Sequence, residues 1–144
     1  MTVRQRFWLC LPPVLACGFD VAATLLGQGP RDWAGDYGSA RELNPLAAPL
    51  LAHHPAAFAG AASAWAAAVA VLSVAWRSPL AVVVAFAVTL GHAIGAAAWM
   101  AAVGPIGYAG AAAWLFAASN FTGFSWRQAG VDLRPGHAGP TRLG

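Results

Sequence analysis

The sequence predicts an all-α integral membrane protein: a bundle of four transmembrane helices with a short interfacial or re-entrant helix before the second span. Apolar residues make up 59% of the chain and charged residues only 9%, whereas about 25% of a typical soluble domain is charged. Four apolar stretches each approach the roughly 20 residues that cross a hydrocarbon core about 30 Å thick. This composition therefore predicts a chain that lies largely within a lipid bilayer.

The first span is expected at residues 7–27, the second at 56–76, the third at 80–102 and the fourth at 106–124. One straight helix over 44–76 would be about 50 Å long, which is too long for the hydrocarbon core. Asn44-Pro45 is a typical start for a helix, and Pro55 can restart one. We therefore expect a separate short helix at 45–53. Residues 1–127 would form the transmembrane domain, and 128–144, rich in Gly, Pro and Arg, a flexible cytoplasmic tail.

The arginines predict the orientation of this bundle. Arg31 and Arg41 fall on one side, and the other six fall on the side of both termini, namely Arg4, Arg6, Arg77, Arg127, Arg134 and Arg142. Basic residues favour the cytoplasmic side, so we expect an inner-membrane protein with both termini in the cytoplasm. The charge is too scattered to form the basic face that nucleic-acid binding requires.

Tryptophans and cysteines add two further expectations. Four tryptophans fall at helix ends, as interfacial anchors do, while Trp65 and Trp114 lie deeper and are expected to pack between helices; the four are Trp8, Trp76, Trp99 and Trp126. Cys10 and Cys17 are separated by about 10 Å along one helix, so no disulfide is expected. In an alternative hypothesis Cys17 is the acylated residue of a lipoprotein signal, but the apolar run continues well past it.

Polar residues inside the spans are the candidate site, because such groups are costly in a bilayer unless they are paired or hydrated. Asp20 and Thr24 share one helix face. Ser63 and His92 lie at depths that match Asp20, in the outer half of the membrane, and the first loop ends with Glu42 and Asn44. We therefore expect one outward-facing polar pocket made by Asp20, Thr24, Glu42, Asn44, Ser63 and His92.

These residues also have structural interpretations. Asp20 could be neutral and hydrogen-bonded to a neighbouring helix, while Glu42 and Asn44 could cap the short helix. His92 lies within Gly91-x-x-x-Gly95, a small-residue pattern that lets helices approach closely. Gly91 and Gly95 are therefore expected at a helix contact.

Two short motifs carry a resemblance. Asp20-x-x-x-Thr24 on the first helix, followed by Glu42-x-Asn44-Pro45 after a polar loop, resembles a family of small prokaryotic multi-pass membrane proteins defined as a domain of unknown function. The resemblance covers roughly residues 14–102 and implies three or four spans, with these five residues as a polar signature. It implies no particular activity. The chain departs from the family where the second span begins, because it has two histidines there and no arginine or lysine.

Three classes of function follow. The first is a scaffold or accessory subunit that docks a larger membrane complex or a second copy through its small residues. The second is binding or transport of cations or protons through Asp20, Glu42 and His92, which could also hold a divalent metal as cofactor. The third is a metal-dependent intramembrane hydrolase, ranked last because the sequence has no HExxH motif and no second intramembrane aspartate.

Overall fold

A computed structural model describes residues 1–42, 44–75 and 79–131 of the chain. Helix accounts for 83% of these residues, and no strand occurs among them. Most of the expected tail, residues 132–144, lies outside the described residues, as do Trp76, Arg77, Arg134 and Arg142. The all-α prediction is confirmed for the part of the chain that is described.

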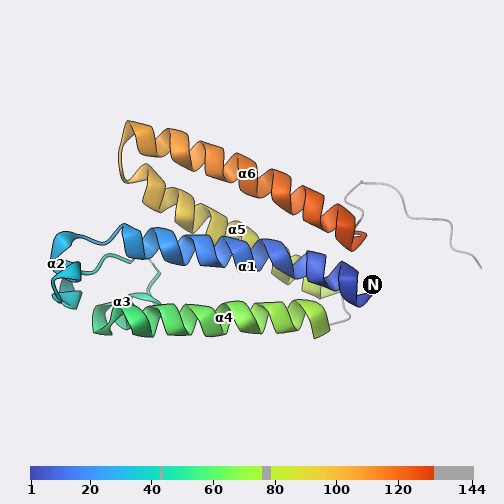
Figure 1. Ribbon diagram of the computed structural model, residues 1–144, viewed down its shortest axis with the longest axis horizontal. Coiled ribbons are helices and arrows are strands. Elements are labelled where there is room, and N and C mark those ends of the chain that lie inside the picture. Colours follow the sequence, from blue (N-terminus) through green and yellow to red (C-terminus); the bar gives the residue numbers. More distant parts are fainter. Residues whose placement is uncertain (43, 76–78, 132–144) are drawn as a thin grey trace, which may run out of the picture.

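Four long helices alternate in direction along the chain, and three short elements gather at the end where α1 finishes and α4 begins (Figure 1). The long helices are α1 (Val3–Leu26), α4 (Pro55–Ala75), α5 (Pro79–Ala101) and α6 (Pro105–Ala129). The short elements are α2 (Pro30–Trp33), the 3-10 turn η1 (Tyr37–Ser39) and α3 (Ala48–His53). Each long helix overlaps one expected span, with α1 starting earlier and α6 ending later than predicted.

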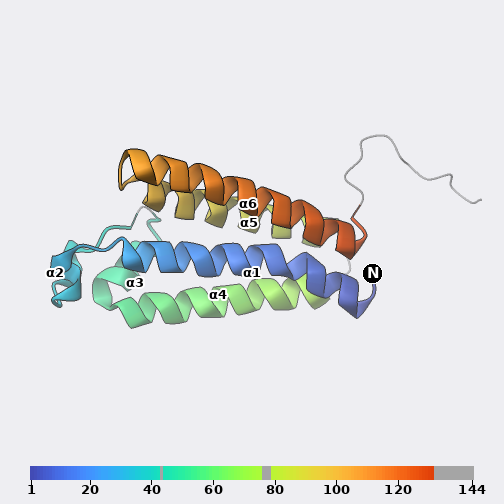
Figure 2. The same ribbon diagram turned by 45° about the horizontal axis from the view of Figure 1, so that its top comes forward.

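Helix α1 is the centre of the bundle. It packs against α4, α5 and α6, and α5 also packs along α6, whereas α4 and α5 touch each other only slightly. Figure 2 shows α5 and α6 in one layer and α1 and α4 in the other. The weak α4–α5 contact leaves space between these two helices, and the candidate site lies there.

Three helices, α1, α4 and α5, are long and apolar enough to cross a membrane. This agrees with the prediction of a membrane protein. Helix α6 is as long as the others but is not among these three, and Ser119, Asn120, Thr122 and several glycines lie along it. By length and composition the described residues thus provide three candidate spans rather than the four expected.

Helix α1 contains two prolines, and α6 compensates for one of them. Pro12 has no N–H to donate to the carbonyl of Trp8 one turn earlier. The hydroxyl of Ser125 on α6 donates to that carbonyl instead, and Ser125 is fully buried. In apolar surroundings a freed carbonyl needs such a partner, so this hydrogen bond holds α6 against α1.

Helix α1 is also hydrogen-bonded to α4, near the N-terminus of α1. A capping box of Thr2 and Gln5 starts α1, and the guanidinium of Arg6 in its first turn donates to the carbonyl of Val74. Val74 lies in the last turn of α4, where unpaired carbonyls attract positive charge. The start of α1 is thereby tied to the end of α4.

The short helix starts later than predicted. It begins at Ala48 rather than at Pro45, because the side chain of Asn44 accepts the amide N–H of Leu46 at 3.0 Å and forms a turn there. The chain does break where expected, since His54 is extended immediately before Pro55 starts α4.

The prediction that Trp126 is an interfacial anchor is wrong. Its side chain is 4% exposed and packs in the core.

The carbonyl of Trp8 provides a test of the α1–α6 contact. Ser125→Ala should destabilise the purified protein by about 0.5–2 kcal/mol, because a buried acceptor loses its donor. In a Pro12→Ala background residue 12 regains its own N–H, so the same Ser125→Ala change should cost less. Unfolding in detergent of the four variants of this cycle measures the coupling, and equal costs in both backgrounds would contradict the assignment.

Candidate functional site

The only aspartate in a long described helix, Asp20, pairs with His92. Nδ1 of His92 lies 2.8 Å from Oδ2 of Asp20, joining α5 to α1. The two side chains are 25% and 21% exposed, respectively. Gly95, one turn after His92, allows this approach, since a Cβ at that position would lie 2.6 Å from Oδ1 of Asp20.

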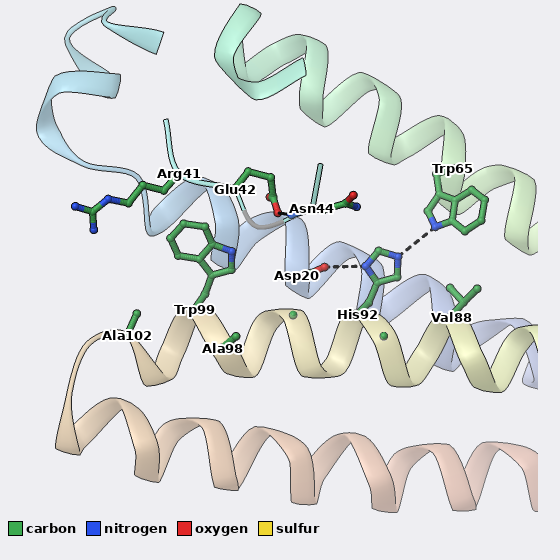
Figure 3. Close-up of a pocket in the computed structure, with 12 residues that line it drawn as sticks. Asp20, Arg41, Glu42, Asn44, Trp65, Val88, His92, Ala98, Trp99 and Ala102 are labelled. Carbon is green, nitrogen blue, oxygen red and sulfur yellow. Dashed lines mark hydrogen bonds and ion pairs between the residues drawn. The ribbon is translucent and has the colours of Figure 1, made fainter. Parts of the chain in front are cut away.

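The second nitrogen of His92 is also engaged. The indole Nε1–H of Trp65 on α4 donates to Nε2 of His92 at 3.1 Å, as Figure 3 shows. An indole nitrogen can only donate, so Nε2 must be the unprotonated acceptor and Nδ1 must carry the proton. The hydrogen bonds therefore assign the neutral Nδ1–H tautomer, which donates to Asp20.

One buried amide positions the loop beside this pair. Gln28, 7% exposed, donates from Nε2 to the carbonyls of Thr24 and Arg41 and accepts the N–H of Arg41 at Oε1, at 2.8–2.9 Å. These hydrogen bonds fix the end of the first loop, at Arg41, against the end of α1. Glu42, which follows Arg41, accepts the N–H of Asn44 at 2.8 Å, so Glu42 and Asn44 are held near Asp20.

Two adjoining pockets surround the Asp20–His92 pair. One, of about 590 Å³, is lined mainly by α5, together with Asp20 of α1, Trp65 of α4 and residues of the first loop. The other, of about 370 Å³, lies between α1 and α4. Five residues line both, namely Asp20, Glu42, Asn44, Trp65 and His92. Four of the six predicted site residues therefore line both pockets.

The other two predicted site residues, Thr24 and Ser63, lie in different surroundings. Thr24 is 2% exposed and lines the smaller pocket, as expected. Ser63 was placed wrongly: it is exposed and donates to the carbonyl of Ala59 in its own helix at 2.8 Å. Of the two glycines expected at a helix contact, only Gly95 meets another helix, since a Cβ at Gly91 would have nothing within 4 Å.

Asp20, Glu42 and His92, the possible ligands of a divalent metal, are not grouped as a three-ligand site in the described residues. Within residues 1–42, 44–75 and 79–131, no three His, Cys, Asp or Glu side chains are grouped closely enough to hold a metal ion. Glu42 lines the same pockets, but its carboxylate is directed to the backbone of Asn44. Asp20 and His92 therefore act as a pair.

Three contributors to the site were not identified from the sequence. Trp65 was expected to be a packing residue, although it hydrogen-bonds His92. Trp99 was expected to be an anchor, but it lines the larger pocket and its ring lies against Gly27. The position of Gln28 two residues after the end of α1 was the available signal for a capping role, since a helix end has unpaired carbonyls.

Comparison with protein-family models, with curated proteins and with solved structures finds no match for this chain. The resemblance to the family with the Asp-x-x-x-Thr and Glu-x-Asn-Pro motifs therefore stays a prediction. Function has to be inferred from the geometry of the site.

The two glycines of α5 offer a matched test of that geometry. Gly95→Ala should displace the Asp20 carboxylate and break its bond to His92, whereas Gly91→Ala should leave the bond intact. The ring ¹⁵N shifts of His92, assigned with a His92→Gln control, report the Nδ1–H tautomer. Identical His92 shifts in Gly95→Ala and in the unmodified protein would show that the close approach is wrong.

Proposed function

We propose that this chain is a multi-spanning membrane protein that takes up protons or binds cations at the Asp20–His92 pair. The observation that supports this is the chain of hydrogen bonds from Trp65 through His92 to Asp20. An ionisable group within a membrane span is costly unless it is paired, and such groups commonly serve proton or ion pathways. The pair also adjoins two pockets, so a proton or cation can reach it.

The charge of the pair explains why it would take up a cation. With His92 neutral and Asp20 ionised, the pair carries one net negative charge in apolar surroundings, which is unfavourable. A proton on Nε2 of His92 neutralises the pair, but then Nε2–H faces the indole N–H of Trp65 and that hydrogen bond is lost. A cation beside Asp20 neutralises the pair without this cost. Protons and cations would therefore compete.

The other titratable or charged groups at this place modulate the competition. Cys17 on α1 and Glu42 in the loop line the smaller pocket together with His92, and Arg41 lines the larger one. Figure 3 shows the Arg41 guanidinium pointing away from Asp20 and His92. The carboxylate of Glu42 therefore adds to the negative potential near the pair.

We also propose four spans, with both termini in the cytoplasm of a cell with an inner membrane. Helix α6 has 25 residues, or about 38 Å of helix, and packs along α5 and α1. Its Ile106 and Phe116 are 87% and 73% exposed, which suits a lipid-facing surface. The arginine distribution favours cytoplasmic termini.

The short helix α3 belongs to the same proposal. It packs against η1 and the start of α4, at the end of the bundle that would face outward. Leu46 and Leu50 are 84% and 38% exposed there. Apolar side chains at that level suit a helix lying at the interface.

A scaffold or accessory-subunit role is the second candidate, and one observation favours it. Helix α4 is the least buried candidate span, with 17% of its apolar window inside the bundle. Its many alanines would let another helix approach closely. A native mass in mild detergent that corresponds only to monomer would count against this role. No geometry in the described residues favours a metal-dependent hydrolase.

Cysteine labelling tests the four-span topology. In a background without Cys10 and Cys17, Thr2→Cys and Gln128→Cys should react with a membrane-impermeant maleimide on one side, and Gly29→Cys and Val103→Cys on the other. If α6 does not cross the bilayer, Gln128→Cys will instead react together with Val103→Cys. Detergent-solubilised protein, in which every site should react, is the control.

Fluorescence of Trp65 tests the proton chemistry. Acidification should change the emission of Trp65, obtained by subtracting spectra of a Trp65→Phe variant, because a second proton on His92 breaks the indole hydrogen bond. Asp20→Asn should move this transition to lower pH, since it removes the charge that stabilises the imidazolium.

The matched control is His92→Gln. Its amide can donate to Asp20 and accept from Trp65 but cannot take up a proton, so the Trp65 emission should become independent of pH over the same range. An unaltered acid transition in His92→Gln would assign the response to another group and refute the proposed role of the pair.

A further inference from the structure

The larger pocket has the size and lining of a site for a small organic molecule. Its volume of about 590 Å³ lies within the roughly 300–1,000 Å³ of ordinary ligand pockets. Apolar side chains form most of its wall, including Val88, Ala98 and Ala102, and polar groups gather at Asp20 and His92. A bare proton or metal ion would leave most of this volume unused.

The charges in the pocket select a positive ligand. Asp20 uses Oδ2 for His92, and Glu42 uses Oε1 for Asn44. In the described part of the chain, the second oxygen of each carboxylate makes no hydrogen bond. The cation that lines the pocket, Arg41, points away from the pair (Figure 3). A ligand beside the two carboxylates would therefore gain most by carrying positive charge.

Two tryptophans add a preference for an organic cation over a metal ion. Trp65 and Trp99 both line the pocket, and Figure 3 shows Asp20 and His92 between them. The face of an indole attracts a cation within about 6 Å. The hydrogen bond from the indole N–H of Trp65 to His92 fixes the Trp65 ring. Ligand binding therefore costs no further rotamer freedom of this side chain.

The pocket also has a route of entry. It is lined mainly from α5, and Trp65 lies across it on α4, a helix that α5 touches only slightly. Gly91, Ala98 and Ala102 on its α5 side are exposed, and they present no bulky side chain to block the opening. In the proposed membrane setting this opening faces the lipid, where a hydrophobic cation concentrates.

From these observations we propose that the protein binds a hydrophobic organic monocation, such as a substituted ammonium or phosphonium, in the larger pocket beside Asp20 and His92. This inference rests on the proposed cation chemistry of the Asp20–His92 pair and gives it a ligand class. The organic groups occupy the apolar part of the pocket beside Trp65 and Trp99. The positive centre lies near Asp20 and Glu42 and competes with protonation of His92.

Two probes of the same shape and opposite charge test the proposal. Tetraphenylphosphonium and tetraphenylborate are each equilibrated with the full-length protein in lipid nanodiscs, and empty nanodiscs of the same lipid correct for partitioning. The cation should bind at least ten-fold more tightly than the anion, and its affinity should fall on acidification. Equal binding of both probes, or no binding beyond empty nanodiscs, would overturn the proposed ligand class.

Variants locate the bound cation. Asp20→Asn and Glu42→Gln should each weaken phosphonium binding several-fold or more, and Trp99→Leu should weaken it as well. Asp36→Asn removes an exposed carboxylate that lies outside the pocket and should leave binding unchanged. If Asp36→Asn weakens binding as much as Glu42→Gln, the binding reflects overall charge and the assigned site is wrong.

The result is separable from the proton proposal. If Trp65 emission titrates with acid but the phosphonium does not bind, the pair handles protons and the organic ligand is excluded. If the phosphonium binds in a manner independent of Asp20 and of pH, the assigned ligand site fails, whereas the proton proposal is decided by the acid transition of Trp65 and its His92→Gln control. Displacement of bound phosphonium by millimolar Na⁺, K⁺ or Mg²⁺ at constant ionic strength would show that the site binds inorganic cations, and the proposed organic ligand class would be wrong.

Discussion

Both ring nitrogens of one histidine are occupied, and the arrangement of three helices depends on this. Through Nδ1, His92 joins α5 to Asp20 on α1, and through Nε2 it joins α5 to Trp65 on α4. The second bond matters most for the shape of the bundle, because α4 and α5 otherwise touch only slightly. The hydrogen bond that joins α5 to α4 beside the larger pocket is therefore also the contact that a proton on Nε2 would break.

The rest of the structure supplies what this contact needs. Gly95 leaves room for the Asp20 carboxylate, and Gln28 fixes the loop that carries Glu42 to the end of α1. On the opposite side, α6 stabilises α1 through Ser125 and through the stacking of Phe19 on Trp114, whose ring centroids lie 4.0 Å apart. Helix α1 is thus held by contacts on several sides, and the site lies where α1, α4 and α5 come together.

The sequence was informative wherever a residue is costly in its surroundings. An aspartate and a histidine at matching depth in apolar spans had to be partnered, and this is why the meeting of Asp20 and His92 could be expected. Ser63 was misplaced because alanine occupies almost every face of α4, so no periodicity shows which way a residue points. The partner of an indole N–H, as for Trp65, depends on the rotation of two helices, and the start of α3 depends on one side-chain turn at Asn44.

The order in which the contacts become available has a consequence for biosynthesis. Asp20 belongs to α1, but its partner is 72 residues further along the chain, and the donor for the Trp8 carbonyl is 117 residues beyond Trp8. At about 5–20 residues per second, the aspartate waits on the order of ten seconds for His92 to be synthesised. Helix α1 must therefore be retained by the insertion machinery, or kept hydrated, until α5 arrives. Assembly of this bundle is completed only after α6, which carries Ser125, has been synthesised.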